Sequence, residues 1–186
     1  MKRLFDLYLS FLATLVLFVP ILLVALLVKL TSTGPVLYWS DRVGIRNDIF
    51  RMPKFRSMKV DTPAVATHLL EDPKSVLTPI GDFLRKSSLD ELPQLWCILK
   101  GDMSFVGPRP ALFNQDDLIG LRTQKGVHEL LPGLTGWAQV NGRDELPIPQ
   151  KVELDVAYLK RQSFSFDIYI LWRTFIKVIY RDGVSH

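Results

Sequence analysis

An uncharged apolar segment near the N-terminus constrains the fold of this chain most strongly. Leu7–Val28 holds 22 residues without a charge, interrupted only by a serine, a threonine and Pro20. At about 1.5 Å rise per residue, a helix of this length could cross the roughly 30 Å hydrocarbon core of a bilayer. We therefore predict a membrane protein, with residues 1–30 as the membrane part and residues 31–186 as one compact domain.

Three membrane arrangements compete for this segment. A cleaved signal peptide would explain the basic start at Lys2 and Arg3, but the apolar run is too long and no small-residue cleavage site follows it. A spanning helix fits by length. Pro20 lies well inside the run, where it interrupts helical hydrogen bonding, and basic residues flank both ends, which pulls both ends toward the cytoplasm. A re-entrant helix broken at Pro20 satisfies both features, so spanning and re-entrant forms stay open on these residues alone.

Charge and cysteine content narrow the class of partner. Residues 1–60 hold nine Lys and Arg against three Asp and Glu, whereas the whole chain carries a net charge of only +4. Basic charge therefore gathers beside the apolar segment, as expected for a surface that faces anionic lipid headgroups. No nucleic-acid motif accompanies it, so we predict no nucleic-acid partner. The single cysteine, Cys97, excludes an internal disulfide and suits a reducing compartment.

The rest of the chain predicts an α/β, mostly helical fold. A short strand is expected at 36–40, Pro53 disfavours a central strand around it, residues 61–78 are a loop or a short irregular helix, and 131–143 are irregular. The helical pattern of the last segment is explained equally by a face packed on the core or by an amphipathic helix in the membrane interface. Helices are expected at 80–86, 93–100, 110–130, 150–161 and 167–180.

The segment SSLDELPQLWCILKGDMSFVGPRP, residues 87–110, carries the candidate chemistry. Asp90 and Glu91 are adjacent carboxylates at a predicted helix start, and Arg109 lies between two prolines that stiffen its backbone. Phosphoryl transfer needs a nucleophile or metal ligand and positive charge for the phosphoryl oxygens, and this segment supplies both. The competing interpretation is structural, because acids at a helix start often serve only as caps, and Ser88 with Glu91 resembles a capping box.

Other catalytic signatures are absent from the sequence. It has no GxGxxG, P-loop or GxSxG motif, and its three histidines, at 68, 128 and 186, are too scattered to suggest a metal cluster or a triad.

Several motifs together resemble the small monotopic phosphoglycosyl transferases of the bacterial sugar transferase family. They are KRLFDL, the proline-broken apolar run, STGPV, KFRSM, the long segment at 87–110 and LPGLTGWAQVNGR. The resemblance implies a re-entrant N-terminal helix, interfacial amphipathic helices and a catalytic domain on the cytoplasmic face of the bacterial inner membrane. It also implies Mg²⁺ dependence and transfer of a sugar phosphate from a UDP-sugar donor to polyprenyl (undecaprenyl) phosphate, with release of UMP.

The same resemblance suggests roles for individual residues. Asp90 matches the nucleophile that forms a covalent phosphosugar intermediate, and Glu91 matches its dyad partner, so both are also the expected Mg²⁺ ligands. Arg109 matches a phosphate-binding arginine.

Three further basic residues follow the family pattern less closely. Lys54 or Arg56 fall in the basic KFRSM segment near the site, and Arg85 matches another basic position. One departure is visible at the helix break, where Val19 precedes Pro20 in place of the family's usual serine, whose hydroxyl could satisfy a freed carbonyl there.

Two rival functions remain on sequence grounds. One is a non-catalytic membrane-tethered partner protein in which the acids only cap a helix, and the other is a UDP-sugar phosphohydrolase in which water resolves the intermediate. The sequence allows a homodimer but does not indicate one, and it does not identify the sugar.

Overall fold

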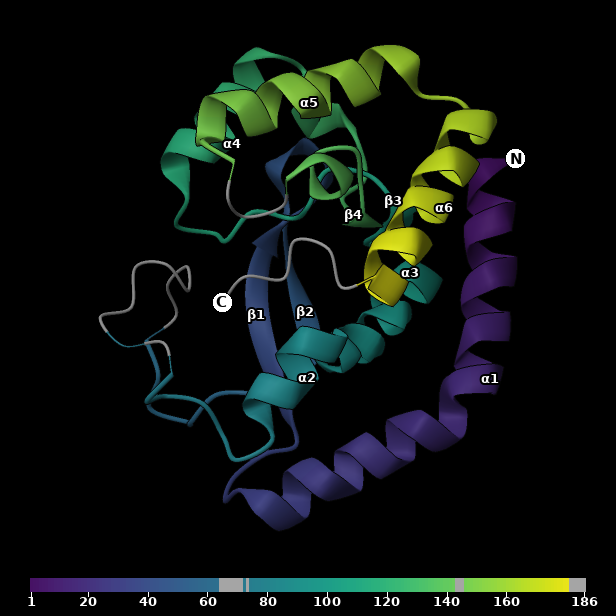
Figure 1. Cartoon of the computed structure of the whole chain (residues 1–186). Coiled ribbons are helices and arrows are strands. Elements are labelled where there is room, and N and C mark those ends of the chain that lie inside the picture. The colour runs from purple at the N-terminus through teal and green to yellow at the C-terminus, as the bar shows by residue number, and fades with distance from the viewer. Residues whose placement is uncertain (64–71, 73, 143–145, 181–186) are drawn as a thin grey trace.

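The computed structural model describes residues 1–63, 72, 74–142 and 146–180 and confirms a mostly helical fold (Figure 1). Most of the expected loop at 61–78 lies outside the described residues. Six α-helices are described: α1 (Lys2–Thr31), α2 (Gly81–Ser87), α3 (Leu95–Lys100), α4 (Asp116–Gln124), α5 (Ile148–Arg161) and α6 (Phe164–Tyr180). Strands and 3₁₀ turns complete the described chain: β1 (Leu37–Val43), η1 (Ile45–Asn47), β2 (Ile49–Phe55), η3 (Leu89–Gln94), β3 (Ser104–Val106), η4 (Val127–Glu129), β4 (Gly133–Thr135) and η5 (Gln139–Asn141).

Helix α1 is the one helix in the described part of the chain that is long and apolar enough to cross a membrane. The mean hydropathy of its most apolar window is 3.0, and only 11% of that window is buried. Figure 1 shows α1 running down one side of the body and then turning to run beneath it. Pro20 is the proline inside the helix, and a residue without an N–H that clashes with the preceding turn is the usual cause of such a bend.

Both ends of α1 are bound to the same body. Near the N-terminus, the Arg3 guanidinium donates to the carbonyl oxygens of Ile98 (2.6 Å) and Leu99 (2.9 Å) at the end of α3. At the other end, Val24 and Val28 are buried against a cluster that includes side chains of β2 and α2. The exposed face between these attachments is almost entirely apolar: Tyr8, Phe11, Leu12, Leu15, Val16, Phe18, Val19, Leu22, Leu23, Leu26 and Leu27.

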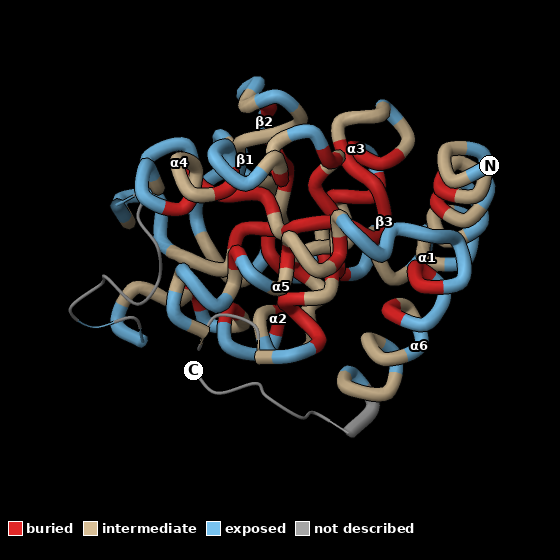
Figure 2. Tube along the Cα trace, turned by 90° about the horizontal axis from the view of Figure 1, so that it is seen from above, coloured by how far each residue is buried: buried red, intermediate tan, exposed pale blue. Residues whose placement is uncertain are grey.

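The main core lies where α3, α5, α6 and the two small sheets meet (Figure 2). Antiparallel pairing of β1 with β2 places Pro53 opposite Trp39. This agrees with the prediction against a central strand, since a strand with one partner does not need the missing N–H. The strand predicted at 36–40 is confirmed and extends to Val43.

Two segments differ from their predicted structure. The helix expected over 110–130 is shorter, because it begins at Asp116, after an isolated β-bridge at Leu112 and a turn, and is followed by η4. The segment expected to be irregular, 131–143, contributes β4, which pairs in parallel with β3. Strands of only three residues carry no readable periodicity, so this pairing was not predicted.

Helix α6 is apolar on two sides. One side suits packing on the core and the other suits a membrane interface, the two interpretations left open by its sequence. Phe166 and Ile170 are buried in the core, while Trp172 and Phe175 are 59% and 57% exposed on the opposite side. Its N-terminal end lies beside α1, where the rings of Phe5 and Phe164 meet edge to face at 5.1 Å. Helix α6 therefore packs one face on the core and leaves a second apolar face exposed.

Candidate active site

The predicted acids lie on a 3₁₀ turn between two short helices. Helix α2 ends at Ser87, and Ser88 takes a left-handed conformation (φ 58°) that turns the chain into η3. This conformation is uncommon for a residue other than glycine and costs about 1 kcal/mol, a strain that often occurs at functional sites. Neither η3 nor α3 has a side-chain cap hydrogen bond. The hydrogen bonds of the expected capping box are therefore not formed, although both acids lie in the first turn of η3.

Glu91 joins three segments that are distant in the sequence. Its Oε1 atom accepts a hydrogen bond from Lys54 Nζ of β2 at 2.9 Å and one from Arg109 Nη2 at 3.0 Å. The structure thus brings together Lys54, Glu91 and Arg109, three of the predicted site residues, with Asp90 adjacent in the chain. Both hydrogen bonds are charge-assisted, which makes them stronger than neutral ones.

Asp90 has a different environment from its neighbour. Its side chain is buried, with 8% of the residue exposed, and in the described part of the chain no hydrogen bond to its carboxyl group is found. Burial raises the pKa of Asp90 to about 6; Lys54 opposes this rise and the Glu91 carboxylate adds to it. The Asp90 carboxyl group therefore titrates close to neutral pH.

Glu91 stays ionised beside it. Burial would raise the pKa of Glu91, but the charges and hydrogen bonds of Lys54 and Arg109 together hold that pKa well below its usual range. Two adjacent carboxyl groups whose environments separate their pKa values indicate two chemical roles, one group fixed as an anion and one able to change its charge.

The backbone of Arg109 is held by a buried ion pair that sequence reasoning missed. Arg122 on α4 donates to the Arg109 carbonyl oxygen at 2.8 Å and contacts Asp155 Oδ2 on α5 at 2.9 Å through Nε and at 2.7 Å through Nη2. The signal in the sequence was the three-residue spacing of Val152, Asp155 and Tyr158, which places this acid on the buried face of an amphipathic helix. The Arg109 side chain remains 37% exposed, so it is accessible to a ligand.

The other two predicted basic residues differ from Lys54 and Arg109. Arg56 is buried, and its guanidinium donates to the Thr33 carbonyl oxygen and to Ser32, through the Ser32 carbonyl at 3.1 Å and Oγ at 2.8 Å. It therefore fastens the C-terminal end of α1 to β2. Arg85 lies close enough to Asp90 to lower its pKa slightly, and its Nη1 is 3.8 Å from Met58 Sδ.

The acids fit only one type of Mg²⁺ site. Among the described residues no group of three or more metal-ligating side chains is found, so a cage made of protein ligands alone is not formed there. Mg²⁺ commonly keeps several waters and binds one or two carboxylates together with substrate phosphates. Asp90 and the Glu91 oxygen that does not face Lys54 and Arg109 are compatible with an ion of that kind.

Comparison with known proteins identifies the family. A family model described as bacterial sugar transferase matches residues 1–181, and the chain therefore belongs to the bacterial sugar transferase family. This confirms the resemblance inferred from the motifs. An uncharacterised sugar transferase of Bacillus subtilis, EpsL, is 40% identical over 187 residues, which cover 100% of this chain and 90% of that protein.

Two longer relatives have names that state a reaction. The UDP-glucose:undecaprenyl-phosphate glucose-1-phosphate transferase of Escherichia coli is 39% identical over 95% of this chain and 40% of its own length. The undecaprenyl-phosphate galactose phosphotransferase of Salmonella typhimurium is 36% identical over 98% of this chain and 41% of its own length. This chain therefore spans less than half the length of these two proteins.

Proposed function

We propose that this protein is a phosphoglycosyl transferase that moves a sugar 1-phosphate from a UDP-sugar to polyprenyl phosphate, most simply undecaprenyl phosphate, and releases UMP. The observation that carries the proposal is the buried Asp90 carboxyl group beside a Glu91 carboxylate held by Lys54 and Arg109. The relatives named as glucose and galactose phosphotransferases support the same donor and acceptor classes.

The reaction proceeds in two displacements at one phosphorus atom. In the first, an Asp90 carboxylate oxygen attacks the β-phosphorus of the UDP-sugar, and the bond from that phosphorus to the bridging oxygen breaks as UMP leaves. In the second, a phosphate oxygen of the lipid attacks the aspartyl-phosphosugar, forms the polyprenyl diphosphosugar and frees Asp90. Splitting the transfer lets a soluble donor and a lipid acceptor use the same site in turn.

The basic residues supply electrostatic stabilisation. Lys54 and Arg109 both contact Glu91 Oε1. A substrate diphosphate bound beside Glu91, or in place of its contacts, would have its negative charge stabilised by the same two cations. Bound with the diphosphate, Mg²⁺ would add positive charge there, and Asp90 and Glu91 are the residues that would hold it. Glu91 keeps the two cations in place when no substrate is bound.

We also propose that α1 is re-entrant and enters one leaflet from the cytoplasmic face of the bacterial inner membrane. Two observations support this: the bend in α1, and the attachment of both its ends to one body through Arg3 and Arg56. A spanning helix would separate those ends by the thickness of the bilayer. Helix α6 contacts α1 at its N-terminal end through Phe164 and Phe5, and its exposed aromatic side would rest at the headgroup boundary.

The test is UMP release from a panel of UDP-sugars by protein in phospholipid nanodiscs with Mg²⁺ and undecaprenyl phosphate. We expect lipid-dependent turnover that is lost in Asp90→Asn. A matched control is Asp102→Asn, since Asp102 is a partly exposed carboxylate twelve residues after Asp90 that pairs with Lys100. Unchanged UMP release in Asp90→Asn would refute Asp90 as the nucleophile. Turnover without the lipid would indicate a phosphohydrolase.

A further inference from the structure

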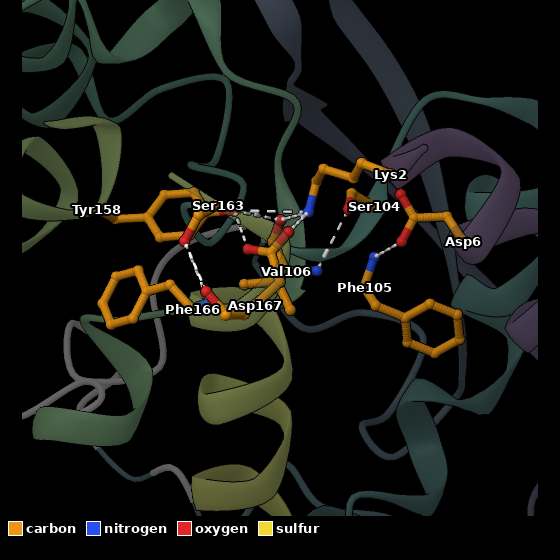
Figure 3. Close-up of polar contacts among 10 residues, drawn as sticks. Lys2, Asp6, Ser104, Phe105, Val106, Tyr158, Ser163, Phe166 and Asp167 are labelled. Atoms are coloured by element: carbon orange, nitrogen blue, oxygen red, sulfur yellow. Dashed lines mark hydrogen bonds and ion pairs between the residues drawn. The ribbon is translucent and has the colours of Figure 1, made fainter. Parts of the chain in front are cut away.

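The side chain of Lys2, in the first turn of α1, is part of a polar network inside the body. The Lys2 ammonium group has three acceptors within reach: Asp167 Oδ2 at 2.5 Å, the Val106 carbonyl oxygen at 3.1 Å and the Tyr158 hydroxyl at 3.5 Å (Figure 3). An ammonium group has three protons, so this set satisfies all of them. Lys2 therefore acts as a fixed structural cation, whereas a headgroup-facing lysine would be free in solvent.

Lys2 is the principal donor to Val106. The Tyr158 hydroxyl also approaches the Val106 carbonyl oxygen, at 3.2 Å, but it is closer to Asp167 Oδ1, at 2.6 Å. The hydroxyl has one proton, and the shorter contact to a carboxylate takes it. Removing Lys2 would thus leave the Val106 carbonyl dependent on a tyrosine that is already engaged.

Asp6 binds Phe105, the residue that precedes Val106 in β3. Its Oδ1 atom accepts a hydrogen bond from the Phe105 backbone N–H at 3.2 Å, and the Asp6 residue is only 2% exposed. Lys2 and Asp6, one turn apart on α1, therefore bind the carbonyl and amide groups of consecutive residues of β3 (Figure 3). These two side chains make the backbone hydrogen bonds that a neighbouring strand would otherwise make with β3.

Strand β3 leads directly into the Arg109 loop, and the connection is stiff. Gly107 follows Val106, and a side chain at Gly107 would meet the Leu131 carbonyl oxygen at 2.3 Å, so the backbone is packed tightly there. Pro108 and Pro110 fix the φ angles on both sides of Arg109. A displacement of Val106 is therefore expected to shift Arg109, because the tight packing at Gly107 and the fixed φ angles of the two prolines leave few bonds that could absorb it.

We infer that Lys2 and Asp6, at the start of the membrane helix, are positioning residues for Arg109, so that the membrane anchor is also part of the active-site scaffold. The inference rests on the proposed function for its effect on turnover. Its structural part, that these side chains hold residues 104–110 in place, stands independently of any reaction.

The first test measures the structural part. Hydrogen exchange of the peptide that covers residues 104–110 is compared in nanodiscs for wild type, Lys2→Met and Asp6→Leu. Lys29→Met is the matched control, because Lys29 is an exposed lysine near the other end of the same helix. We expect exchange at Phe105 and Val106 to accelerate about tenfold or more in the first two variants and to stay unchanged in Lys29→Met. Unchanged exchange in Lys2→Met and Asp6→Leu overturns the inference, whether or not the protein is an active transferase.

The second test asks whether Lys2 acts through Arg109. The kcat/KM for UMP release is measured for wild type, Lys2→Met, Arg109→Ala and the double variant. We expect Lys2→Met to lower kcat/KM about tenfold in the wild-type background and less than twofold when Arg109 is already absent. If Lys2→Met lowers kcat/KM by the same factor with and without Arg109, Lys2 supports the fold in general, and the positioning role is overturned.

Conservative variants separate positioning from a failure to fold. Asp6→Asn keeps an oxygen that can accept from Phe105 and is expected to retain kcat/KM within about threefold, whereas Asp6→Leu loses it. Tyr158→Phe removes one hydroxyl and leaves Lys2 in place, so its exchange at Val106 should stay close to wild type. Equal losses in Asp6→Asn and Asp6→Leu would contradict the inference. An inactive wild type with the expected exchange pattern would refute only the proposed function.

Discussion

At the scale of single residues, two neighbouring acids differ because of the partners that the fold brings to them. Glu91 meets Lys54 from 37 residues earlier and Arg109 from 18 residues later. Asp90 is buried with its carboxyl group free of such bonds among the described residues. The sequence predicted the identity of these residues through their motif, but their different charge states depend on long-range contacts that no local pattern encodes.

The pKa of Asp90 predicts how the first half-reaction depends on pH. The nucleophile must be a carboxylate, and its pKa is about 6, so the rate is expected to be constant above pH 7 and to fall about tenfold per unit below pH 6. The measurement is the UMP burst without acceptor from pH 5 to 8, which leaves out ionisation of the lipid phosphate. A burst that stays constant down to pH 5 would contradict a buried, titrating Asp90.

The same shift predicts that Asp90→Asn stabilises the protein. The folded-state pKa of about 6 lies above the ordinary value of 3.8, so between these values the folded state binds more protons and stability falls as pH rises. Above pH 6 the ionised carboxylate destabilises the fold by an amount of order 1–3 kcal/mol, which Asn removes.

Thermal unfolding in nanodiscs at several pH values tests this prediction. We expect the midpoint of Asp90→Asn to exceed that of wild type at pH 8 and to match it below about pH 4. Asp102→Asn, which changes an acid at the surface, should show no such pattern. A lower midpoint for Asp90→Asn at pH 8 would indicate that the Asp90 carboxylate is stabilising.

At the scale of elements, the sequence predicted most helices and missed the pairing that positions the site. Helices α2, α5 and α6 lie within a few residues of their expected ranges, because apolar periodicity and turn residues mark them locally. The parallel pair of β3 with β4 was missed. It depends on Gly107 and Gly133 letting two backbones approach closely, which is a tertiary property.

Arg56 illustrates the same limit, and its contacts predict a structural role. Its guanidinium binds Ser32 and Thr33 at the end of α1, so Arg56→Ala should leave these contacts unmade and lower stability by about 2–4 kcal/mol. The KM for the UDP-sugar should change little. Arg51→Ala, an exposed arginine on β2 over the Trp39 ring, is the control and should cost less than about 1 kcal/mol. A rise in KM at unchanged stability would instead support the phosphate-binding role expected from the motif.

At the scale of the whole molecule, the membrane helix and the candidate active site form one connected structure. Arg3 and Lys2 bind α3 and β3 at one end of α1, and Arg56 binds the other end. Hydropathy and charge alone left spanning and re-entrant forms open, since they do not indicate which groups each end contacts, and only the family resemblance predicted the re-entrant form. The attachment of both ends to one body is what favours the re-entrant form.

Cysteine labelling tests this topology directly. The native Cys97 should not react with the maleimide, because burial raises the pKa of its thiol to about 11 and its side chain is almost inaccessible. A cysteine in a short tag ahead of Met1 and a second at Lys29→Cys are each probed with a membrane-impermeant maleimide in inverted and right-side-out vesicles. Both should react only in inverted vesicles. Labelling of the two sites from opposite sides would establish a spanning helix.

The central claim is that Asp90 forms a covalent bond to the sugar phosphate. The most direct measurement is intact-protein and peptide mass spectrometry after incubation with Mg²⁺ and the UDP-sugar that releases UMP, in the absence of lipid acceptor. We expect one phosphosugar adduct on the peptide that carries Asp90, absent in Asp90→Asn, retained in Asp102→Asn and discharged by undecaprenyl phosphate. UMP release with no adduct on wild type, or an adduct that persists in Asp90→Asn, would contradict this claim.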